Sequence, residues 1–203
     1  MKKLIIIGAG GHGRVVADIA ALNGYDDIAF LDDADISVCG EYPVIGKINE
    51  RKDMYHDAEY VVAIGNNHVR ANFCSWLKEK GARLATLIHP RSAIAQSVRI
   101  GIGTVVMAGA VVNPYAVIGD GVILNTCSSV DHDSYVGDYS HISVGAHLCG
   151  SVKVGEKVFA GAGSTVINNI SVCDDAILGA GTVVINDINE TGTYVGVPAE
   201  KIK

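Results

Sequence analysis

Aliphatic residues recur at every sixth position through the second half of the chain. The run begins at Ile94, ends at Val184, spans sixteen hexads without an insertion, and departs from a branched aliphatic only at Ala160. A helix would need a period near 3.6 and a flat strand a period of 2, so neither explains the pattern. A strict six-residue repeat is the signature of a parallel β-helix, in which three hexads form one triangular coil. The repeat therefore predicts an all-β prism of a little over five coils.

The first ninety residues carry a different pattern, in which short apolar runs alternate with stretches of helical periodicity. The order predicts an α/β domain, Rossmann-like, with a small parallel sheet and flanking helices. We therefore expect two domains, residues 1–88 and residues 89–203. The predicted strands are Leu4–Ile7, Ile28–Leu31, Tyr60–Ile64 and Arg83–Leu87, and the predicted helices run over 14–23 and from about 67 to 80.

Three loops follow the predicted strands of this first domain, and parallel strands bring their carboxyl ends to one edge of a sheet. The loops contain Gly8–Gly13, Asp32-Asp33 and Gly65–Asn67. Backbone amides of a glycine turn that includes Gly8 and Gly10 would suit phosphates. His12 would contact a phosphate or sugar, or would only fill the turn before the helix.

The spacing of Gly8, Gly10 and Gly13, with Asp32 nineteen residues later, also matches the fingerprint of a dinucleotide site. The predicted domain is only about half the size of a usual dinucleotide fold. A mononucleotide or a nucleotide sugar therefore fits it better than NAD.

Charge and cysteine content narrow the class of protein further. The formal net charge is −6, and residues 94–193 contain 3 basic and 9 acidic side chains, which argues against a nucleic-acid partner. An anionic ligand of the repeat must depend on few cations and on backbone amides. The five cysteines form no CxxC pair and fit buried positions in a reducing cytoplasm. The apolar run at Leu4–Ile7 is too short for a signal, and no stretch would span a membrane.

The segment 125–150 departs from the monotony of the repeat. His132 lies at the third position of its hexad, an expected corner, between Asp131 and Asp133. A carboxylate beside an imidazole orients the ring and stabilises its protonated form, which suits a general base. Gly150 is expected one coil above His132, where the absence of a side chain would leave room for a second substrate. A purely structural role for His132 at this corner is the alternative.

Two further histidines, His141 and His147, lie within the same segment. Each holds the last position of its hexad, so the two are expected on different sides of one coil. Three histidines invite a zinc interpretation, but on a single chain His132, His141 and His147 would face different directions. We therefore expect no metal, and structural roles for His141 and His147 remain possible.

An ordered set of motifs links the two predicted domains to a known family. In chain order they are GAGGHG at 8–13, FLDD at 30–33, AIGNN at 63–67, LIHP at 87–90, NTCSSVDHD at 125–133, SHISVGA at 140–146 and GVPA at 196–199. Together with the hexads, this set resembles the hexapeptide-repeat sugar O-/N-acyltransferases, a family that includes sialic acid O-acetyltransferases. The resemblance is closest to bacterial N-acetyltransferases of UDP-4-amino-sugars.

The resemblance implies a left-handed β-helix and a cytoplasmic homotrimer with active sites at the subunit interfaces. Acetyl-CoA would lie in a groove of the β-helix. His132 matches the family's catalytic base, and Asp133 stands where relatives often carry Glu. Asn125 matches a polar residue near the base, His141 a residue that contacts the acetyl carbonyl, and Gly150 a backbone amide at that site.

The resemblance also implies a substrate and a reaction. The nucleotide-sugar pocket would include Gly8, His12, Asp32, Asp33, Gly65 and Asn66. The expected reaction is acetyl transfer to the 4-amino group of a UDP-4-amino-4,6-dideoxy-N-acetylhexosamine. The alternatives are O-acetylation of a sialic acid or another sugar hydroxyl, and a trimeric nucleotide-sugar-binding scaffold without catalysis.

Overall fold

The structure, a computed structural model, describes residues 2–48 and 56–203. The chain divides into two compact units, Met1–Pro90 and Arg91–Lys203. Each unit has its own fold. The first unit contains the alternating strand and helix patterns, and the second contains the hexad repeat.

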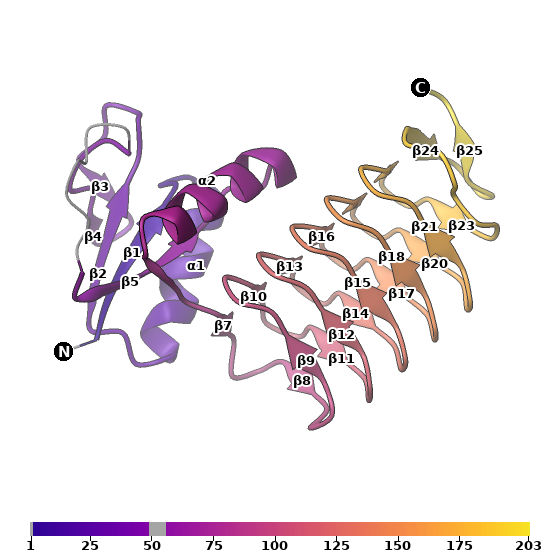
Figure 1. Cartoon of the computed structure of the whole chain (residues 1–203), viewed down its shortest axis with the longest axis horizontal. Coiled ribbons are helices and arrows are strands. Elements are labelled where there is room, and N and C mark those ends of the chain that lie inside the picture. Colours follow the sequence, from indigo (N-terminus) through magenta and orange to yellow (C-terminus); the bar gives the residue numbers. More distant parts are fainter. Residues whose placement is uncertain (1, 49–55) are drawn as a thin grey trace. The chain divides into compact units, whose positions relative to one another are not determined.

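The first unit is a four-stranded parallel sheet with two helices, shown in indigo to magenta in Figure 1. The strand order is β2-β1-β5-β6, so the predicted small parallel sheet is confirmed. The connections β1-α1-β2 and β5-α2-β6 run in opposite directions from the centre, and right-handed crossovers therefore place the two helices on opposite faces. The elements are β1 Lys3–Ile7, α1 Gly11–Leu22, β2 Asp27–Leu31, β5 Ala58–Val62, α2 Asn67–Glu79 and β6 Arg83–Leu84.

The central strands of this sheet explain its apolar runs. In β1 the four residues from Leu4 to Ile7 are each 0% exposed, because a parallel strand covered by helices is buried on both faces. The strand order reverses direction between β1 and β5, which makes their carboxyl ends a switch point where ligands bind such sheets. Gly8 follows β1 there, and Gly65 follows β5.

The fourth predicted strand, 83–87, is wrong in its extent. Only Arg83–Leu84 pairs with β5, and Leu87–Ile88 forms a separate strand, β7. The side chain of Asn23, at the end of α1, donates to the carbonyl of Ile88 at 2.8 Å and accepts from its N–H at 3.0 Å. These two hydrogen bonds satisfy the N–H and carbonyl groups of Ile88, which therefore needs no partner in the four-stranded sheet. A short hairpin of β3 Val38–Cys39 and β4 Tyr42–Pro43 was also not predicted.

The second unit confirms the predicted parallel β-helix. Each of the sixteen hexads contains a two-residue strand whose second residue is the aliphatic anchor, and each strand pairs in parallel with the strand 18 residues away, as Val111 does with Ser129. The coils stack in the order of the sequence (Figure 1). The strands fall on three faces.

Face 1 contains β10 Val105–Val106, β13 Ile123–Leu124, β16 His141–Ile142, β19 Phe159–Ala160 and β22 Ile177–Leu178. Face 2 contains β8 Ala93–Ile94, β11 Val111–Val112, β14 Ser129–Val130, β17 His147–Leu148, β20 Thr165–Val166 and β23 Val183–Val184. Face 3 contains β9 Arg99–Ile100, β12 Val117–Ile118, β15 Tyr135–Val136, β18 Lys153–Val154 and β21 Ser171–Val172. Beyond the hexads, β24 Thr193–Val195 adds to β22 and pairs in antiparallel fashion with β25 Glu200–Lys201.

The core of the prism is built from two positions of each hexad. The anchors from Val106 to Val184 expose 3% or less of their surface, and most of the residues four places after an anchor are buried, with Thr104 and Ser140 at 0%. Burial of this continuous column is the main stabilising contribution. Some of the polar small residues hydrogen-bond across coils: Ser140 Oγ donates to the carbonyl of Gly155 at 2.8 Å, whereas the buried hydroxyls of Ser128 and Ser164 make no hydrogen bond within the described residues.

The corners of the prism share one backbone conformation. The third residue after each anchor, from Gly103 to Gly181, has φ between 55° and 74°. This left-handed region favours Gly, Asn and Asp, and Asp133 occupies it with φ 57°. Cys127 lies at such a corner and is exposed, and Cys149 and Cys173 are half-buried, so the expectation of buried cysteines is confirmed only for Cys39 and Cys74.

Of the helices in the described part of the chain, none is long and apolar enough to cross a membrane.

Candidate functional site

The first cluster of candidate residues surrounds His132, at the corner between β14 on face 2 and β15 on face 3. Its Nδ1 lies 2.8 Å from Oδ2 of Asp133, and the two side chains are 54% and 58% exposed. This hydrogen bond raises the pKa of His132, and the negative charge of Asp131 raises it further. A neutral ring that donates its Nδ1 hydrogen to Asp133 keeps the lone pair on Nε2, so Nε2 is the basic atom.

A second carboxylate, Asp131, holds the backbone of the same corner. Its Oδ1 accepts from the N–H of His132 at 2.8 Å and from Nδ2 of Asn113 at 2.7 Å. The bond from Asn113, followed by that from His132, lowers the pKa of Asp131, so this carboxylate is charged at neutral pH. The sequence placed Asp131 beside the histidine but did not single out Asn113. The only available signal was an offset of 18 residues, one coil, between Asn113 and Asp131.

Gly150 lies one coil above His132, as expected, but the predicted reason for a glycine there was wrong. A Cβ on Gly150 would lie 2.7 Å from both Cε1 and Nε2 of His132. The imidazole itself therefore occupies the space that we expected a second substrate to use. The absence of a side chain at Gly150 allows His132 to adopt this position.

Asn125, expected near the base, instead lies beside His141, the residue expected at the acetyl carbonyl, on face 1. Nδ2 of Asn125 is 3.0 Å from Nε2 of His141, and Oδ1 of Asn125 accepts the N–H of Thr126 at 2.8 Å. Because Oδ1 is committed as an acceptor, Nδ2 is the donor and Nε2 of His141 accepts. The ring is 9% exposed and packs edge-on against Phe159, with centroids 5.3 Å apart. Asn125 is thus paired with His141 in this structure.

Within a single chain, His132 and the Asn125–His141 pair lie on different sides of the prism. His132 occupies the corner between faces 2 and 3, and in a three-sided prism that corner is opposite face 1, where His141 lies. One coil cannot bring both histidines to the same reacting atoms. His147, on face 2, makes a different contact: its Nδ1 is 2.8 Å from Oγ of Ser129. Across residues 2–48 and 56–203, no three His, Cys, Asp or Glu side chains gather as ligands of a metal would.

The glycine turn of the first unit forms the second cluster, at the switch point between β1 and β5. Gly8 has φ 103°, and a Cβ there would lie 2.9 Å from the carbonyl oxygen of Ala63, at the exit of β5. A Cβ on Gly13 would collide with the carbonyl oxygen of Gly8. Gly10 is the N-cap of α1 without a side-chain cap, and a Cβ on it would meet no atom within 4 Å. The close packing thus requires glycine at 8 and 13, whereas Gly10 faces open space.

Asp32 joins the loop after β2 to this turn. Its Oδ2 accepts the N–H of Ala9 at 2.6 Å, and its Oδ1 accepts the N–H of Ala34 at 2.8 Å. The carboxylate expected to bind a ribose therefore also holds the glycine turn in place. Asp33 is exposed and accepts the N–H of Ile48 at 2.9 Å.

His12 and Arg70 lie near each other at the same edge of the sheet, where β1 and β5 end. Burial, followed by the charge of Arg70, lowers the pKa of His12 to about 4, so the ring is neutral at neutral pH. Its Nε2 is buried and makes no hydrogen bond within the described residues. Arg70 is 1% exposed and donates to the carbonyls of Ile64 and Gly65 at 2.9 and 3.2 Å. This buried cation, which shapes the loop after β5, was missed by the sequence analysis because it lies on the helical pattern of α2.

Asn66, expected in the nucleotide-sugar pocket, has a structural role in the first unit: it caps α2 by accepting the N–H of Val69 at 3.0 Å. Gly65 has no such constraint, since a Cβ there would meet no atom within 4 Å. The hairpin contributes Cys39, whose Sγ donates to the carbonyl of Ala9 at 3.1 Å. A cavity of about 220 Å³ adjoins this contact and is lined by Arg14, Ala17, Asp18, Cys39, Gly40, Glu41 and Tyr42.

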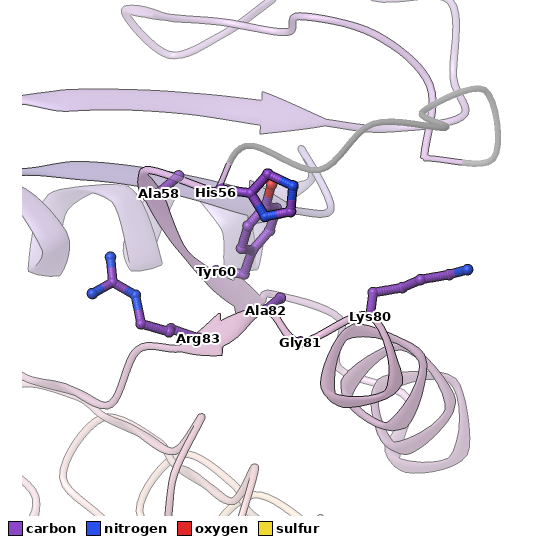
Figure 2. A pocket seen from close by; sticks show the side chains of 7 residues that line it. All are labelled: His56, Ala58, Tyr60, Lys80, Gly81, Ala82 and Arg83. Atoms are coloured by element: carbon purple, nitrogen blue, oxygen red, sulfur yellow. The ribbon is translucent and has the colours of Figure 1, made fainter.

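A separate small cavity lies at the amino ends of β5 and β6, the edge of the sheet away from the glycine turn. His56, Lys80 and Arg83 line it. Figure 2 shows that the side chains of Lys80 and Arg83 point in opposite directions, away from the cavity, while His56 lies beside Tyr60. Because the cations do not converge, this cavity does not form an anion site.

Face 3 carries much of the small positive charge of the repeat. Arg99 is the outward residue of β9 and Lys153 that of β18. A shallow cavity of about 330 Å³ on this face includes Lys153 together with Tyr135, Ser171, Cys173, Ile188 and Asn189. Tyr135 belongs to β15, the strand that follows the His132 corner, so the cavity begins close to the candidate base.

Known proteins resemble this chain in both of its units. The PglD N-terminal domain family matches residues 3–77. The chain is similar to UDP-N-acetylbacillosamine N-acetyltransferase of Bacillus subtilis (strain 168), with 37% identity over 115 residues. That stretch covers 53% of this chain and 52% of the Bacillus protein, so the match spans about half the length of this curated relative.

Two solved structures are similar over nearly their whole length. The acetyltransferase domain of PglB from Neisseria gonorrhoeae FA1090 is 40% identical, with 100% of both chains covered and a TM-score of 0.96, and that domain is also known in complex with acetyl coenzyme A. PerB from Caulobacter crescentus, in complex with CoA and GDP-perosamine, is 36% identical over 100% of this chain and 98% of that chain, with a TM-score of 0.91.

Proposed function

The chain belongs to the hexapeptide-repeat sugar O-/N-acyltransferase family, and we propose that it acetylates the 4-amino group of a UDP-4-amino-4,6-dideoxy-N-acetylhexosamine. It is an acetyl-CoA-dependent sugar N-acetyltransferase, because the relatives that match it over their whole length are acetyltransferases of this kind. The finer proposal concerns the acceptor sugar and the residues that act on it. The observation that carries it is the oriented pair of His132 and Asp133, with Nδ1 and Oδ2 2.8 Å apart.

In the proposed reaction His132 acts as the general base. The sugar amine attacks the thioester carbonyl, Nε2 of His132 takes a proton from the amine, and the C–N bond forms as the carbonyl becomes a tetrahedral oxyanion. Collapse then breaks the C–S bond, and the imidazolium of His132 gives its proton to the departing sulfur, so that CoA leaves as the thiol and the base is regenerated. Asp133 holds the ring through Nδ1 so that the basic Nε2 is presented, and it stabilises the imidazolium that forms.

Completion of the site by a second copy follows from the geometry of one coil. His132 and the Asn125–His141 pair lie on opposite sides of the prism. If both take part in one reaction, His132 of one chain must meet face 1 of a neighbour. A homotrimer with cyclic symmetry would repeat this contact three times and complete three equivalent sites. Exposed apolar side chains at the same corner, Tyr115 at 69% and Ile167 at 37%, support a covered corner.

We assign the two substrates to different units of the chain. We place the nucleotide sugar at the switch point of the first unit, where the amino end of α1, Asp32 and the buried Nε2 of His12 converge on the glycine turn. A phosphate there would accept from backbone N–H groups and from His12. For acetyl-CoA, the cavity on face 3 offers Lys153 to an anionic phosphate and an apolar floor that includes Ile188.

Gly150 and His141 would serve the acetyl carbonyl. Acyl transfer is accelerated when hydrogen-bond donors are aimed at the developing oxyanion. Gly150 lies directly beside the Nε2 edge of His132, so its backbone amide is close to the place where the tetrahedral intermediate must form. The five free cysteines fit a reducing compartment, and we place the protein in the cytoplasm on that ground.

The proposal is tested by a comparison of acceptors. Release of the CoA thiol would be measured with a UDP-4-amino-4,6-dideoxy-N-acetylhexosamine, a GDP-4-amino-sugar and a free sialic acid, each with acetyl-CoA. We expect the highest kcat/KM with the UDP-amino-sugar. Faster turnover of the GDP-sugar would correct the nucleotide, and faster turnover of sialic acid would replace amine transfer with hydroxyl transfer. The relatives are named as N-acetyltransferases, which favours the amine over the hydroxyl alternative.

A further inference from the structure

We propose that Asp131, anchored by Asn113, is a positioning residue for His132, placing a fixed negative charge beside the base and holding its backbone. The inference rests on the proposed function, because it assigns a partner to the base of that reaction. It concerns a pair of residues that belong to two successive coils, Asp131 beside the histidine and Asn113 one coil below it.

The contacts form a chain that crosses from one coil to the next. Nδ2 of Asn113 donates to Oδ1 of Asp131 at 2.7 Å, and the same oxygen accepts the N–H of His132 at 2.8 Å. Asn113 and Asp131 each directly follow an anchor, and their anchors Val112 and Val130 are paired partners in the stack. The asparagine therefore ties the carboxylate to the frame of the prism, and the carboxylate ties down the residue that bears the imidazole.

Comparison with another corner shows what is special here. At the corner after face 3, Oδ1 of Asp120 accepts the N–H of Ile102, one coil below, at 2.9 Å. Oδ1 of Asp138 accepts the N–H of Asp120 in the same way at 2.8 Å. Those carboxylates bond to the coil beneath them. Asp131 instead bonds within its own coil, to the N–H of the histidine itself, and receives the cross-coil bond from Asn113.

The titratable groups around His132 are few, so the contribution of Asp131 can be isolated. On its own corner they are Asp131 and Asp133; the coil above presents Cys149 and the coil below presents Tyr115. The bond to Asp133 is the larger cause of the raised pKa of His132, and the charge of Asp131 is the next. The side chains are exposed, so their effect is screened by salt. Asp133 thus orients the ring, whereas Asp131 fixes the backbone of His132 and supplies a second negative charge.

This arrangement favours the step in which His132 becomes an imidazolium. A fixed anion near the ring stabilises the protonated form without any movement during the reaction. Removal of the charge would make His132 a weaker base, and proton transfer in the transition state follows the strength of the base. The high-pH limit of kcat should then fall by about 3- to 10-fold.

The test measures the pKa of His132 directly in the full chain without substrates. The Cε1 proton of His132 would be followed by NMR from pH 5 to 9, with assignment from the spectrum of His132→Ala. Asp131→Asn removes the charge but keeps an oxygen that can accept the N–H of His132. Asn113→Ala keeps the charge and removes its anchor. Asp120→Asn is the matched control, because it removes a carboxylate that caps a backbone N–H at a different corner.

We expect the pKa of His132 to fall in Asp131→Asn, to fall less in Asn113→Ala, and to stay at the wild-type position in Asp120→Asn. The acid limb of kcat/KM should move to lower pH in the same order, while KM for both substrates stays within about twofold. An unchanged pKa in Asp131→Asn, or an equal change in Asp120→Asn, overturns the proposal. If Asp131→Asn does not fold, Asn113→Ala alone decides, since an unchanged pKa there contradicts the anchoring role. The titration needs no turnover, so a wild-type enzyme inactive on every amino-sugar would refute the proposed function and leave this result intact.

Discussion

His12 and His132 show how two regions of one chain use the same side chain in opposite ways. His12 is half-buried in the first unit with its Nε2 shielded from solvent, and desolvation and the charge of Arg70 lower its pKa to about 4. His132 is exposed at a corner of the β-helix, where hydrogen bonding to Asp133 and the charge of Asp131 raise its pKa. Near neutral pH the first ring therefore has no charge and offers a hydrogen bond, whereas the second readily takes a proton.

The difference lies in the surroundings that each fold provides. A parallel sheet with helices on both faces brings its loops together at the switch point, where Asp32 holds the glycine turn and Arg70 holds the loop after β5. A solenoid has almost no interior beyond its aliphatic column, so polar groups lie on its corners. The first unit is thus suited to holding a ligand, and the second to presenting a reactive group.

The largest effect should come from removal of the reactive group. His132→Ala should lower kcat by about 10²- to 10⁴-fold, the usual contribution of a positioned base. Binding of the nucleotide sugar should be unchanged, because the pocket of the first unit is intact. Steady-state kinetics of CoA release measure kcat. A loss below about fivefold would assign the base to another residue.

A smaller loss should follow when the imidazole is only displaced. Gly150→Ala introduces a Cβ 2.7 Å from Cε1 and Nε2 of His132, so the ring must move. We expect kcat to fall by about 10- to 100-fold, with a melting temperature within a few degrees of wild type, because an exposed side chain can yield. Wild-type kcat in this variant would show that the position of the ring in the structure is not the reactive one.

In the first unit, the corresponding perturbation should cost stability. Gly13→Ala places a Cβ against the carbonyl oxygen of Gly8, whereas Gly10→Ala, its matched control, meets no atom within 4 Å. We expect a loss of about 2 to 3 kcal/mol in the free energy of unfolding for the first change and less than about 1 kcal/mol for the second. Urea denaturation of both variants checks this. Equal losses would mean that the close approach at Gly13 can relax.

A further loss of stability in the first unit should depend on pH. The folded pKa of His12 is about 4, below the ordinary value of 6.5 for a free histidine side chain, so the unfolded chain binds a proton more readily. Its contribution is therefore complete above pH 6.5 and is lost as the pH falls toward 4, by up to about 3 kcal/mol. Denaturation between pH 7.5 and 4.5 should show a shallower acid loss for His12→Gln than for wild type. Identical slopes would contradict the buried neutral state of His12.

Much of this molecule could be predicted from its sequence because the hexad repeat is unbroken. The period alone gives the three faces and the buried column, and Gly8 and Asp32 lie at the expected edge of the sheet. The split of residues 83–88 into two strands could not be predicted, since it depends on the bond between Asn23 and Ile88, residues far apart in the chain.

Within the site, the sequence identified side chains but not their contacts. His132 and Asp133 are neighbours in the chain, so their bond was within reach of sequence reasoning. The roles of Asn113 and Gly150 depend on contacts across one coil, in which the exact direction of a corner decides what touches what. Arg70 was hidden because a cation on a helix is usually solvated, and only the structure shows it 1% exposed.

The most direct test of the division between the units is the affinity for the nucleotide sugar in two variants. Isothermal titration of the UDP-4-amino-sugar would give Kd for wild type, His12→Ala and His132→Ala. The account predicts about tenfold or weaker binding for His12→Ala, from the loss of a buried hydrogen bond to an anionic ligand, and a Kd within about twofold of wild type for His132→Ala. Full affinity in His12→Ala together with lost affinity in His132→Ala would contradict it, since the sugar would then be held by the β-helix and not by the first unit.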